Sequence, residues 1–296
     1  RKTNFFVELI ETPTPVLQLL VLGVMYGLLY GVLALGLSLV WGVMKVVNFA
    51  HGDFVIVGAY ASYWAFVLGG LNPVESLLFT LPLGLAMGAV VYLGLIRRVE
   101  QSPQLMSLLL TFGLSTLIIG SLLYIYTPTS RAVPFFLPAF ESSDIVLPGN
   151  VAVAAAYALI VAAFMELFLH RTFWGKAIRA VTEDRNSALL VGVNPTKISL
   201  LSFMIGISVA TSVGSMVMLL QSISPISGAQ LRMLSFVIVV LGGLGSPTGA
   251  LVGGILIGVI GSISSIWLNA ALTPVIGFII LVLVLIVRPY GLMGSK

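Results

Sequence analysis

The chain has 296 residues, of which 59% are hydrophobic and only 8% are charged, and its formal net charge is +4. Soluble domains carry about 25% charged residues, and a soluble fold of this composition would expose large apolar patches, so a soluble protein is excluded. The apolar runs have helix length and do not alternate with polar residues, which excludes a transmembrane barrel, and we attribute the basic excess to loops that orient helices rather than to nucleic acid binding.

Apolar runs follow one another along the whole chain, and a membrane-spanning helix needs about 20 such residues. The sequence therefore predicts an all-α polytopic transmembrane bundle with about eight to nine membrane segments, which form a single transmembrane domain over 1–296. Two runs are short, and we predict broken or re-entrant helices near 42–54 and 233–249. The runs lie at about 17–41, 54–70, 74–96, 105–126, 148–170, 199–220, 233–245, 249–268 and 272–287.

Basic residues divide the loops into two groups. The loops 97–104 and 171–198 and the C-terminus are rich in lysine and arginine, whereas 127–147 and 221–232 contain one arginine each. By the positive-inside rule the first group is cytoplasmic. We therefore expect a cytoplasmic C-terminus and an outer loop that contains Arg232, while the side of the N-terminus stays open.

The stretch VNFAHGDF, Val47 to Phe54, places polar residues between two long apolar runs. His51 and Asp53 are two positions apart and would not share a helix face. The chain also has no cysteine, so a catalytic dyad or a metal site is disfavoured. A proton relay remains an alternative, because ionisable groups inside a membrane are usually functional. One histidine and one aspartate are, however, few groups for a relay.

Two structural interpretations of this stretch remain. In one, it is a helix break at membrane depth, where Asn48 and Asp53 bond to freed backbone groups, Gly52 takes a positive φ, and Asp53 begins a second half-helix. A matching break is then expected around 242–249. In the other, the stretch is a polar cytoplasmic turn. We expect Asn48 and Asp53 to hold backbone geometry and His51 to face the pathway or a partner subunit.

Glycines recur every fourth residue in two places, which puts them on one helix face and permits close approach of helices. They serve packing within the chain or a dimer interface, and the first interpretation is favoured. The two stripes are Gly23, Gly27 and Gly31, and Gly245, Gly249 and Gly253.

The longest loop of the basic group, Arg171 to Ser199, is expected to form one or two short helices between Lys176 and about Val191. Thr182 resembles a helix N-cap followed by acidic residues, and Gly192 is a plausible helix stop. The loop has a mixed charge and apolar positions. It could dock into a groove on a soluble partner or lie on the bilayer surface, and both readings stay open.

Three blocks carry a family resemblance: GLLYGVLALGLSLVWGVMKVVNFAHGDFVIVGAYAS, GKAIRAVTEDRNSALLVGVN and VLGGLGSPTGALVGGILIG. Together they resemble the permease of branched-chain amino acid ABC transporters, in the shorter of that family's two permease types, over about 17–290. The resemblance implies a cytoplasmic (inner) membrane of bacterial or archaeal type. It also implies a second, related permease subunit, two cytoplasmic ABC ATPase subunits and an extracytoplasmic solute-binding protein.

The resemblance also implies roles for particular residues. The Arg171–Ser199 loop would be the segment that couples to the ATPases, with candidates Lys176, Arg179, Glu183, Asp184, Arg185, Ala188 and Gly192. The candidates for the substrate pathway are Asn48, His51, Gly52, Asp53, Gln221, Ser224 and Ser227.

The chain contains no G-x-x-x-x-G-K-[ST] phosphate-binding loop, so ATP and Mg²⁺ are expected on partner subunits. We therefore predict a permease that is not itself an enzyme and that binds no metal or cofactor of its own. It would contact membrane lipid and protein partners, but no nucleic acid. Two alternatives stay open: a permease of the same family for urea, short amides or aromatic acids, and an ATP-independent channel or ion-coupled secondary transporter.

Overall fold

A computed structural model describes residues 14–142, 145–266 and 273–294. Arg1 and Lys2, which bear on the side of the N-terminus, and Lys296 at the C-terminus lie outside the described residues.

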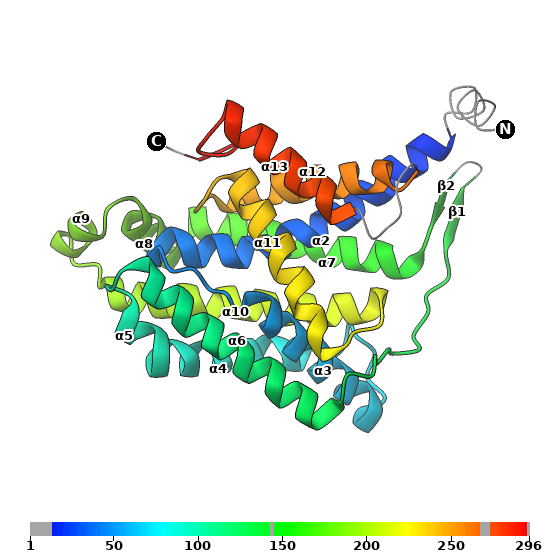
Figure 1. Cartoon of the computed structure of the whole chain (residues 1–296), viewed down its shortest axis with the longest axis horizontal. Helices are drawn as coiled ribbons and strands as arrows, with labels where there is room; N and C mark the ends of the chain where they lie inside the picture. The colour runs from blue at the N-terminus through cyan, green and yellow to red at the C-terminus, as the bar shows by residue number, and fades with distance from the viewer. Residues whose placement is uncertain (1–13, 143–144, 267–272, 295–296) are drawn as a thin grey trace.

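The described chain is built almost entirely from helices (Figure 1). Among the described residues, β1 pairs with β2 in antiparallel register, with Phe140 opposite Leu147. In chain order the elements are α2 (Thr14–Met44), α3 (His51–Gly69), α4 (Leu77–Val91), η1 (Tyr92–Ile96), α5 (Arg97–Val99), α6 (Gln104–Tyr126), β1 (Phe140–Ser142), β2 (Ile145–Leu147), α7 (Gly149–Arg171), α8 (Phe173–Glu183), α9 (Arg185–Leu190), α10 (Pro195–Leu220), η2 (Pro225–Ser227), α11 (Gly228–Gly242), α12 (Pro247–Ser264) and α13 (Thr273–Val287).

Among the described residues, 8 helical stretches are long and apolar enough to cross a membrane, and Val275–Val287 is a shorter apolar helix. The predicted polytopic helical bundle of about eight to nine segments is therefore confirmed. The chain leaves helical geometry between Met44 and His51, as predicted. It leaves it again between Gly242 and Pro247, but there Gly245 packs against Gly42, near the end of α2, so this interruption is a turn at the end of the bundle and not a matching break inside it.

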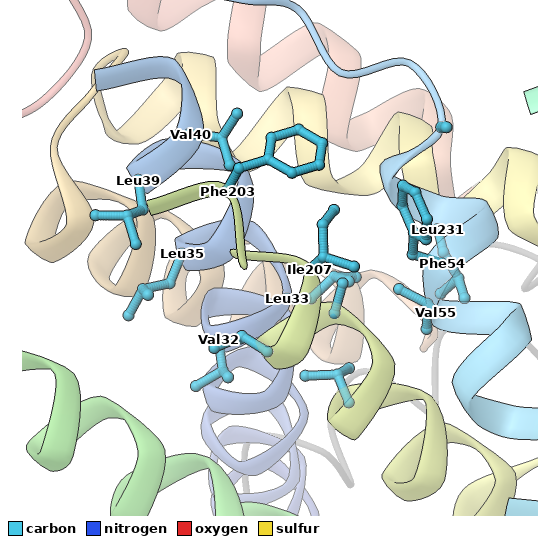
Figure 2. Close-up of a cluster of buried hydrophobic side chains, with 14 of the residues drawn as sticks. Val32, Leu33, Leu35, Leu39, Val40, Phe54, Val55, Phe203, Ile207 and Leu231 are labelled. Carbon is cyan, nitrogen blue, oxygen red and sulfur yellow. The ribbon is translucent and has the colours of Figure 1, made fainter. Parts of the chain in front are cut away.

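The core is formed where α10 crosses α2 and α3. In the most apolar 18-residue stretch of α10, 83% of the residues are buried, whereas the corresponding share in α6 is 17%. Helix α10 is therefore the central helix, and α6 lies at the periphery. Figure 2 shows the packed side chains at this crossing. They are Val32, Leu33, Leu35, Leu39 and Val40 of α2, Phe54 and Val55 of α3, Phe203 and Ile207 of α10, and Leu231 of α11.

Gly23, Gly27 and Gly31 lie where α2 packs closely on α12. A Cβ atom added at Gly27 would lie 2.6 Å from the Cα of Ile255, and Gly254 and Gly258 approach α2 from the other side. Helices can approach this closely only where the facing residues are small. The α2 stripe therefore makes a contact inside one chain.

The second glycine stripe differs from the expectation. Gly249 and Gly253 lie on α12 and pack against Gly242 and Ile238 of α11. Gly245 precedes α12, and its φ of +83° belongs to the turn between α11 and α12, so it does not share their helix face. Pro247 at the first helical positions sets the start of α12 after Gly245.

The basic segments gather at one end of the bundle, called here the basic end (Figure 1). Arg185 of α9 contacts Glu100, just after α5. Gly42, near the end of α2, lies beside Thr182 of α8. The C-terminal tail reaches the same end, because the backbone N–H of Leu292 donates to the carbonyl of Leu241 at 2.9 Å.

Candidate functional site

The VNFAHGDF stretch forms a break inside the bundle rather than at its end. Helix α2 stops at Met44, and α3 begins at His51, whose Nε2 lies 2.9 Å from the carbonyl oxygen of Leu33. Leu33 precedes Met44 by about three helical turns, or about 16 Å along the axis. The start of α3 therefore lies beside the middle of α2, which favours the broken helix over the cytoplasmic turn.

The unwound backbone before α3 is tied down by neighbouring polar groups. The side-chain oxygen of Asn48 accepts a hydrogen bond from the N–H of Ala50 at 3.2 Å. On α6, the Thr111 hydroxyl oxygen accepts from the N–H of Phe49 at 3.0 Å and lies 2.9 Å from the carbonyl oxygen of Val47. Backbone groups away from water need such partners, so α6 helps to hold the break.

Asp53 and Arg232 form an ion pair inside the bundle. Asp53, in the first turn of α3, is 1% exposed, and its Oδ2 lies 3.3 Å from Nη1 of Arg232 on α11. The same guanidinium donates to the hydroxyl of Ser115 at 2.9 Å and lies 4.1 Å from the ring centre of Phe49. Isolated buried charges are costly, and an opposite charge with further hydrogen bonds offsets that cost.

This pair corrects two expectations. Arg232 does not belong to an outer loop: it is a buried residue of α11, because its charge is matched inside the protein. Asp53 does not bond to freed backbone groups next to it in sequence. Its partner comes from α11, whose first residue, Gly228, also lies against Asp53. The positive end of the α11 dipole therefore adds to the neutralisation of Asp53.

His51 and Gly52 also differ from the expectation. The side chain of His51 is fully buried between α2 and α3, so it faces neither an open path nor the surface of this chain. Gly52 does not have a positive φ and lies within α3. A Cβ atom at Gly52 would lie 2.6 Å from the backbone nitrogen of Arg232. Glycine is needed at position 52 for the close approach of α11, not for a turn.

The second group of pathway candidates lies apart from the first. Gln221 is exposed at the end of α10, and the hydroxyls of Ser224 and Ser227 bond to each other across η2 at 3.1 Å. None of these three side chains is the one that lies against Asp53; that residue is their neighbour Gly228. The structure therefore does not bring these seven candidates together along one open path.

A cavity of about 740 Å³ lies between α2, α11, α12 and α13. Its lining is mainly apolar, and Tyr26, Tyr30 and Gln230 are among the residues with polar groups that line it. Helix α11 separates this cavity from the ion pair: Gln230, Met233, Leu234 and Val237 line the cavity, while Arg232 points to α3. The VNFAHGDF stretch thus holds one face of α11, and the opposite face of α11 lines the cavity.

Sequence reasoning missed this cavity, although one signal was present. Tyr26 and Tyr30 are four positions apart on α2, and their ring centres are 6.3 Å apart. They follow the same spacing as the glycine stripe, on a neighbouring face of the helix. In the part of the chain that the structure describes, no three His, Cys, Asp or Glu side chains come together to hold a metal ion.

The residues from Thr172 to Gly192, called here the α8–α9 segment, form two short helices at the basic end. The predicted N-cap at Thr182 is wrong, because its hydroxyl donates to the Ile178 carbonyl inside α8. The caps are Thr172, which accepts from the N–H of Gly175, and Asp184, which accepts from that of Asn186 at 2.9 Å. Gly192 ends the segment with a φ of +86°.

The two helices expose different surfaces. Ala177, Ile178 and Val181 of α8 are buried against the bundle, and Nε of Arg179 donates to the Leu169 carbonyl of α7 at 3.1 Å. On α9 only Ala188 is buried. The remaining candidates Lys176 and Glu183 are exposed. Apolar side chains project from the end of α9: Leu189, Leu190 and Val191 are 59%, 87% and 77% exposed.

Comparisons with known proteins agree with this architecture. The family model described as "Branched-chain amino acid transport system / permease component" matches residues 19–286. The chain belongs to this family. It is 28% identical over 302 residues to the high-affinity branched-chain amino acid transport system permease protein LivH of Escherichia coli K12, covering 94% of this chain and 95% of that protein.

Other members are similar over comparable lengths. The corresponding permease protein BraD of Pseudomonas aeruginosa is 30% identical over 294 residues, with 94% of this chain and 95% of that protein covered. A probable LivH of Methanocaldococcus jannaschii is 28% identical over 284 residues, with 92% and 90% covered. Among solved structures, PsaBC from Streptococcus pneumoniae in complex with Fab matches with a TM-score of 0.51, 12% identity and coverage of 96% and 94%. This permease component therefore shares its fold with that structure.

Proposed function

We propose that this multi-pass membrane permease is the transmembrane subunit of an ATP-binding-cassette importer for branched-chain or similar amino acids. It forms half of the pathway, and a second, related permease subunit completes it. Two ABC ATPases bind on the cytoplasmic side, and an extracytoplasmic binding protein delivers the solute. The basic end is then cytoplasmic, as the positive-inside rule requires, and the C-terminus lies on that side.

The observation that carries this proposal is the shape of the α8–α9 segment. Its α8 half is fixed to the bundle by buried Ala177, Ile178 and Val181, while its α9 half exposes Leu189, Leu190 and Val191. A short helix that exposes apolar side chains and is held in place by a neighbouring packed helix fits a groove on a soluble partner. The chain has no phosphate-binding loop of its own, so we assign ATP binding and hydrolysis to that partner.

We assign the solute path of this subunit to the cavity beside α11. An apolar wall with a few polar groups suits a solute with a branched aliphatic side chain and a polar backbone. The ion pair between Asp53 and Arg232 fixes the wall helix from behind. In this proposal the VNFAHGDF residues shape the path without touching the solute.

A co-purification experiment tests the proposed function. The chain, expressed with its neighbouring permease, is used to retain the cognate ATPase subunits. Gly192→Trp should reduce the retained ATPase, because a side chain at a φ of +86° distorts the end of α9. A matched control is Gly120→Trp on α6, where an added Cβ atom meets nothing within 4 Å. Equal retention by the wild type and the Gly192 variant would count against docking at this segment.

Two alternatives give different results. A permease of the same family for urea, short amides or aromatic acids would retain the ATPases but would respond to those solutes. An ATP-independent channel or an ion-coupled secondary transporter would retain no ATPase and would move solute without one.

A further inference from the structure

Glu100 occupies an unusual position at the basic end. It follows α5, at the end of the continuous helical path formed by α4, η1 and α5. Its side chain is only 3% exposed, although Glu100 is a charged residue in the connection between α5 and α6. A carboxylate so removed from water needs several hydrogen-bond donors.

Three elements supply those donors. Nη1 of Arg185, the first residue of α9, lies 2.6 Å from Oε1 of Glu100. The hydroxyl of Ser199, in the first turns of α10, donates to the same oxygen at 2.5 Å. The hydroxyl of Tyr92, the first residue of η1, donates to Oε2 at 2.7 Å. Glu100 therefore joins α9, α10 and η1 at one point.

This junction matters because α9 has few other attachments. Of its six residues only Ala188 is buried. Within the described residues, the Arg185–Glu100 contact is the one ion pair between the α8–α9 segment and the rest of the chain. The helices on the other side of the junction are central: α10 is the most buried span, and the ring of Tyr92 packs 6.2 Å from that of Phe203 on α10.

The segment beside Glu100 is also irregular. Tyr92 to Ile96 form a π-helical turn between α4 and α5. Such turns interrupt the regular hydrogen-bond ladder and are frequent at functional sites. A displacement of Glu100 would act directly on this turn, since the Tyr92 side chain holds its carboxylate.

From this geometry we propose that Glu100 is a positioning residue that transmits displacement of α9 to α4 and α10. The inference rests on the proposed function, in which an ATPase pushes or pulls on the α8–α9 segment. The ATPase would contact the exposed apolar end of α9. Glu100, which holds Arg185 at the start of α9, would convert that motion into motion of the central helices.

The test uses the complete transporter in proteoliposomes with its binding protein, and radiolabelled leucine as the probe. The quantity measured is the leucine imported per ATP hydrolysed. Glu100→Gln, which keeps the size but removes the charge, should lower this ratio at least about fivefold, the lower range of couplings between sites. The ATPases should stay bound to the Glu100→Gln complex, because the docking surface of α9 is unchanged.

A double-mutant cycle tells whether Glu100 and Arg185 act through their contact or affect the ratio independently. Arg185→Gln should lower the ratio by a similar factor, and Glu100→Gln/Arg185→Gln should lower it no further than Glu100→Gln alone. The matched control is Glu166→Gln, because Glu166 is a half-exposed carboxylate paired with His170 within α7. This control should keep the wild-type ratio.

The inference is overturned if assembled Glu100→Gln keeps the wild-type ratio, or if the losses of the two single variants multiply in the double variant. If Glu100→Gln does not assemble, Arg185→Gln decides: a loss of about fivefold supports the inference and a wild-type ratio overturns it. Failure of the proposed function has a separate signature. In that case wild-type proteoliposomes import leucine without ATP or not at all, and the inference fails with it.

Discussion

The guanidinium of Arg232 lies 3.3 Å from the carboxylate of Asp53, although 179 positions separate the two residues along the chain. The contact joins the start of α3, after the break between Met44 and His51, to the second turn of α11. The opposite face of α11 lines the cavity that we assign to the solute. The pair thus links the helix break before α3 to the wall of the proposed path.

Asp53→Asn should destabilise the protein. It leaves the Arg232 charge buried without a counter-charge, which costs about 3–5 kcal/mol when one partner of a buried pair is removed. The free energy of unfolding in mild detergent measures this loss. Asp53→Asn/Arg232→Met should recover part of it, because no unpaired charge remains.

We expect the same change to impair assembly before it affects substrate choice. Yield of the assembled complex and the solute profile of its ATPase activity distinguish the two effects. A normally assembled Asp53 variant with changed selectivity alone would contradict the supporting role given to this residue.

Gly27→Ala should weaken the α2–α12 contact. The added methyl group would lie 2.6 Å from the Cα of Ile255, a backbone atom that cannot rotate away. Overpacking of this kind costs about 1–3 kcal/mol, which a thermal unfolding scan of the purified chain can detect. Gly120→Ala is the matched control, since that position opens to free space and alanine favours the helix by up to about 1 kcal/mol. Equal unfolding midpoints for the two variants would refute the close contact.

Leu190→Glu should release the ATPase subunits without unfolding the chain. Leu190 is 87% exposed, so the substitution removes no internal packing but places a charge on the proposed docking surface. We expect at least about tenfold weaker binding of the ATPases, or about 1.4 kcal/mol, in a titration with purified subunits. Phe136→Ser, at an 85% exposed position outside the α8–α9 segment, should leave that affinity unchanged.

The cap of α9 should respond to pH only in acid. A hydrogen bond from the Ser187 hydroxyl, followed by those from the N–H groups of Asn186 and Ser187, lowers the pKa of Asp184 from its ordinary value of 3.8. Because the folded-state pKa is depressed, the stabilisation is fully present above the unfolded value and is lost as pH falls through the folded value. The cap is therefore intact across the neutral range.

Amide hydrogen exchange of Asn186 and Ser187, corrected for intrinsic rates, tests this dependence. The wild type should keep its protection at neutral pH and lose it below pH 3.8, whereas Asp184→Ala should show low protection at every pH. A loss of wild-type protection between pH 5 and 8 would point to a different titrating group.

The sequence was sufficient to predict the helical spans and the break after Met44, because long apolar runs and their interruptions are local features. It did not show that the interruption after Gly242 is a turn at the end of the bundle. It placed the glycine stripe of α2 on one face, but the partner of that face, α12, is more than two hundred residues away and leaves no local signal. Arg232 was assigned to a loop for the same reason. A charge near the start of an apolar run resembles a loop residue unless its distant partner, Asp53, is known.

The α8–α9 segment shows a different limit. Thr172, Thr182 and Asp184 are all suitable N-cap residues by type, so composition alone does not select the true caps. The choice depends on which helix face is buried. In the structure α8 runs from Phe173 to Glu183 and buries Ile178 and Val181, so Thr182 lies inside the helix and Asp184 caps α9.

The most direct test of the proposed function is leucine uptake into proteoliposomes that contain this chain, its neighbouring permease and the cognate ATPases. We predict that uptake requires ATP, both ATPase subunits and the binding protein. We also predict that branched-chain amino acids stimulate ATP hydrolysis more than urea, short amides or aromatic acids do. Uptake that continues without ATP and without partner subunits would contradict the account.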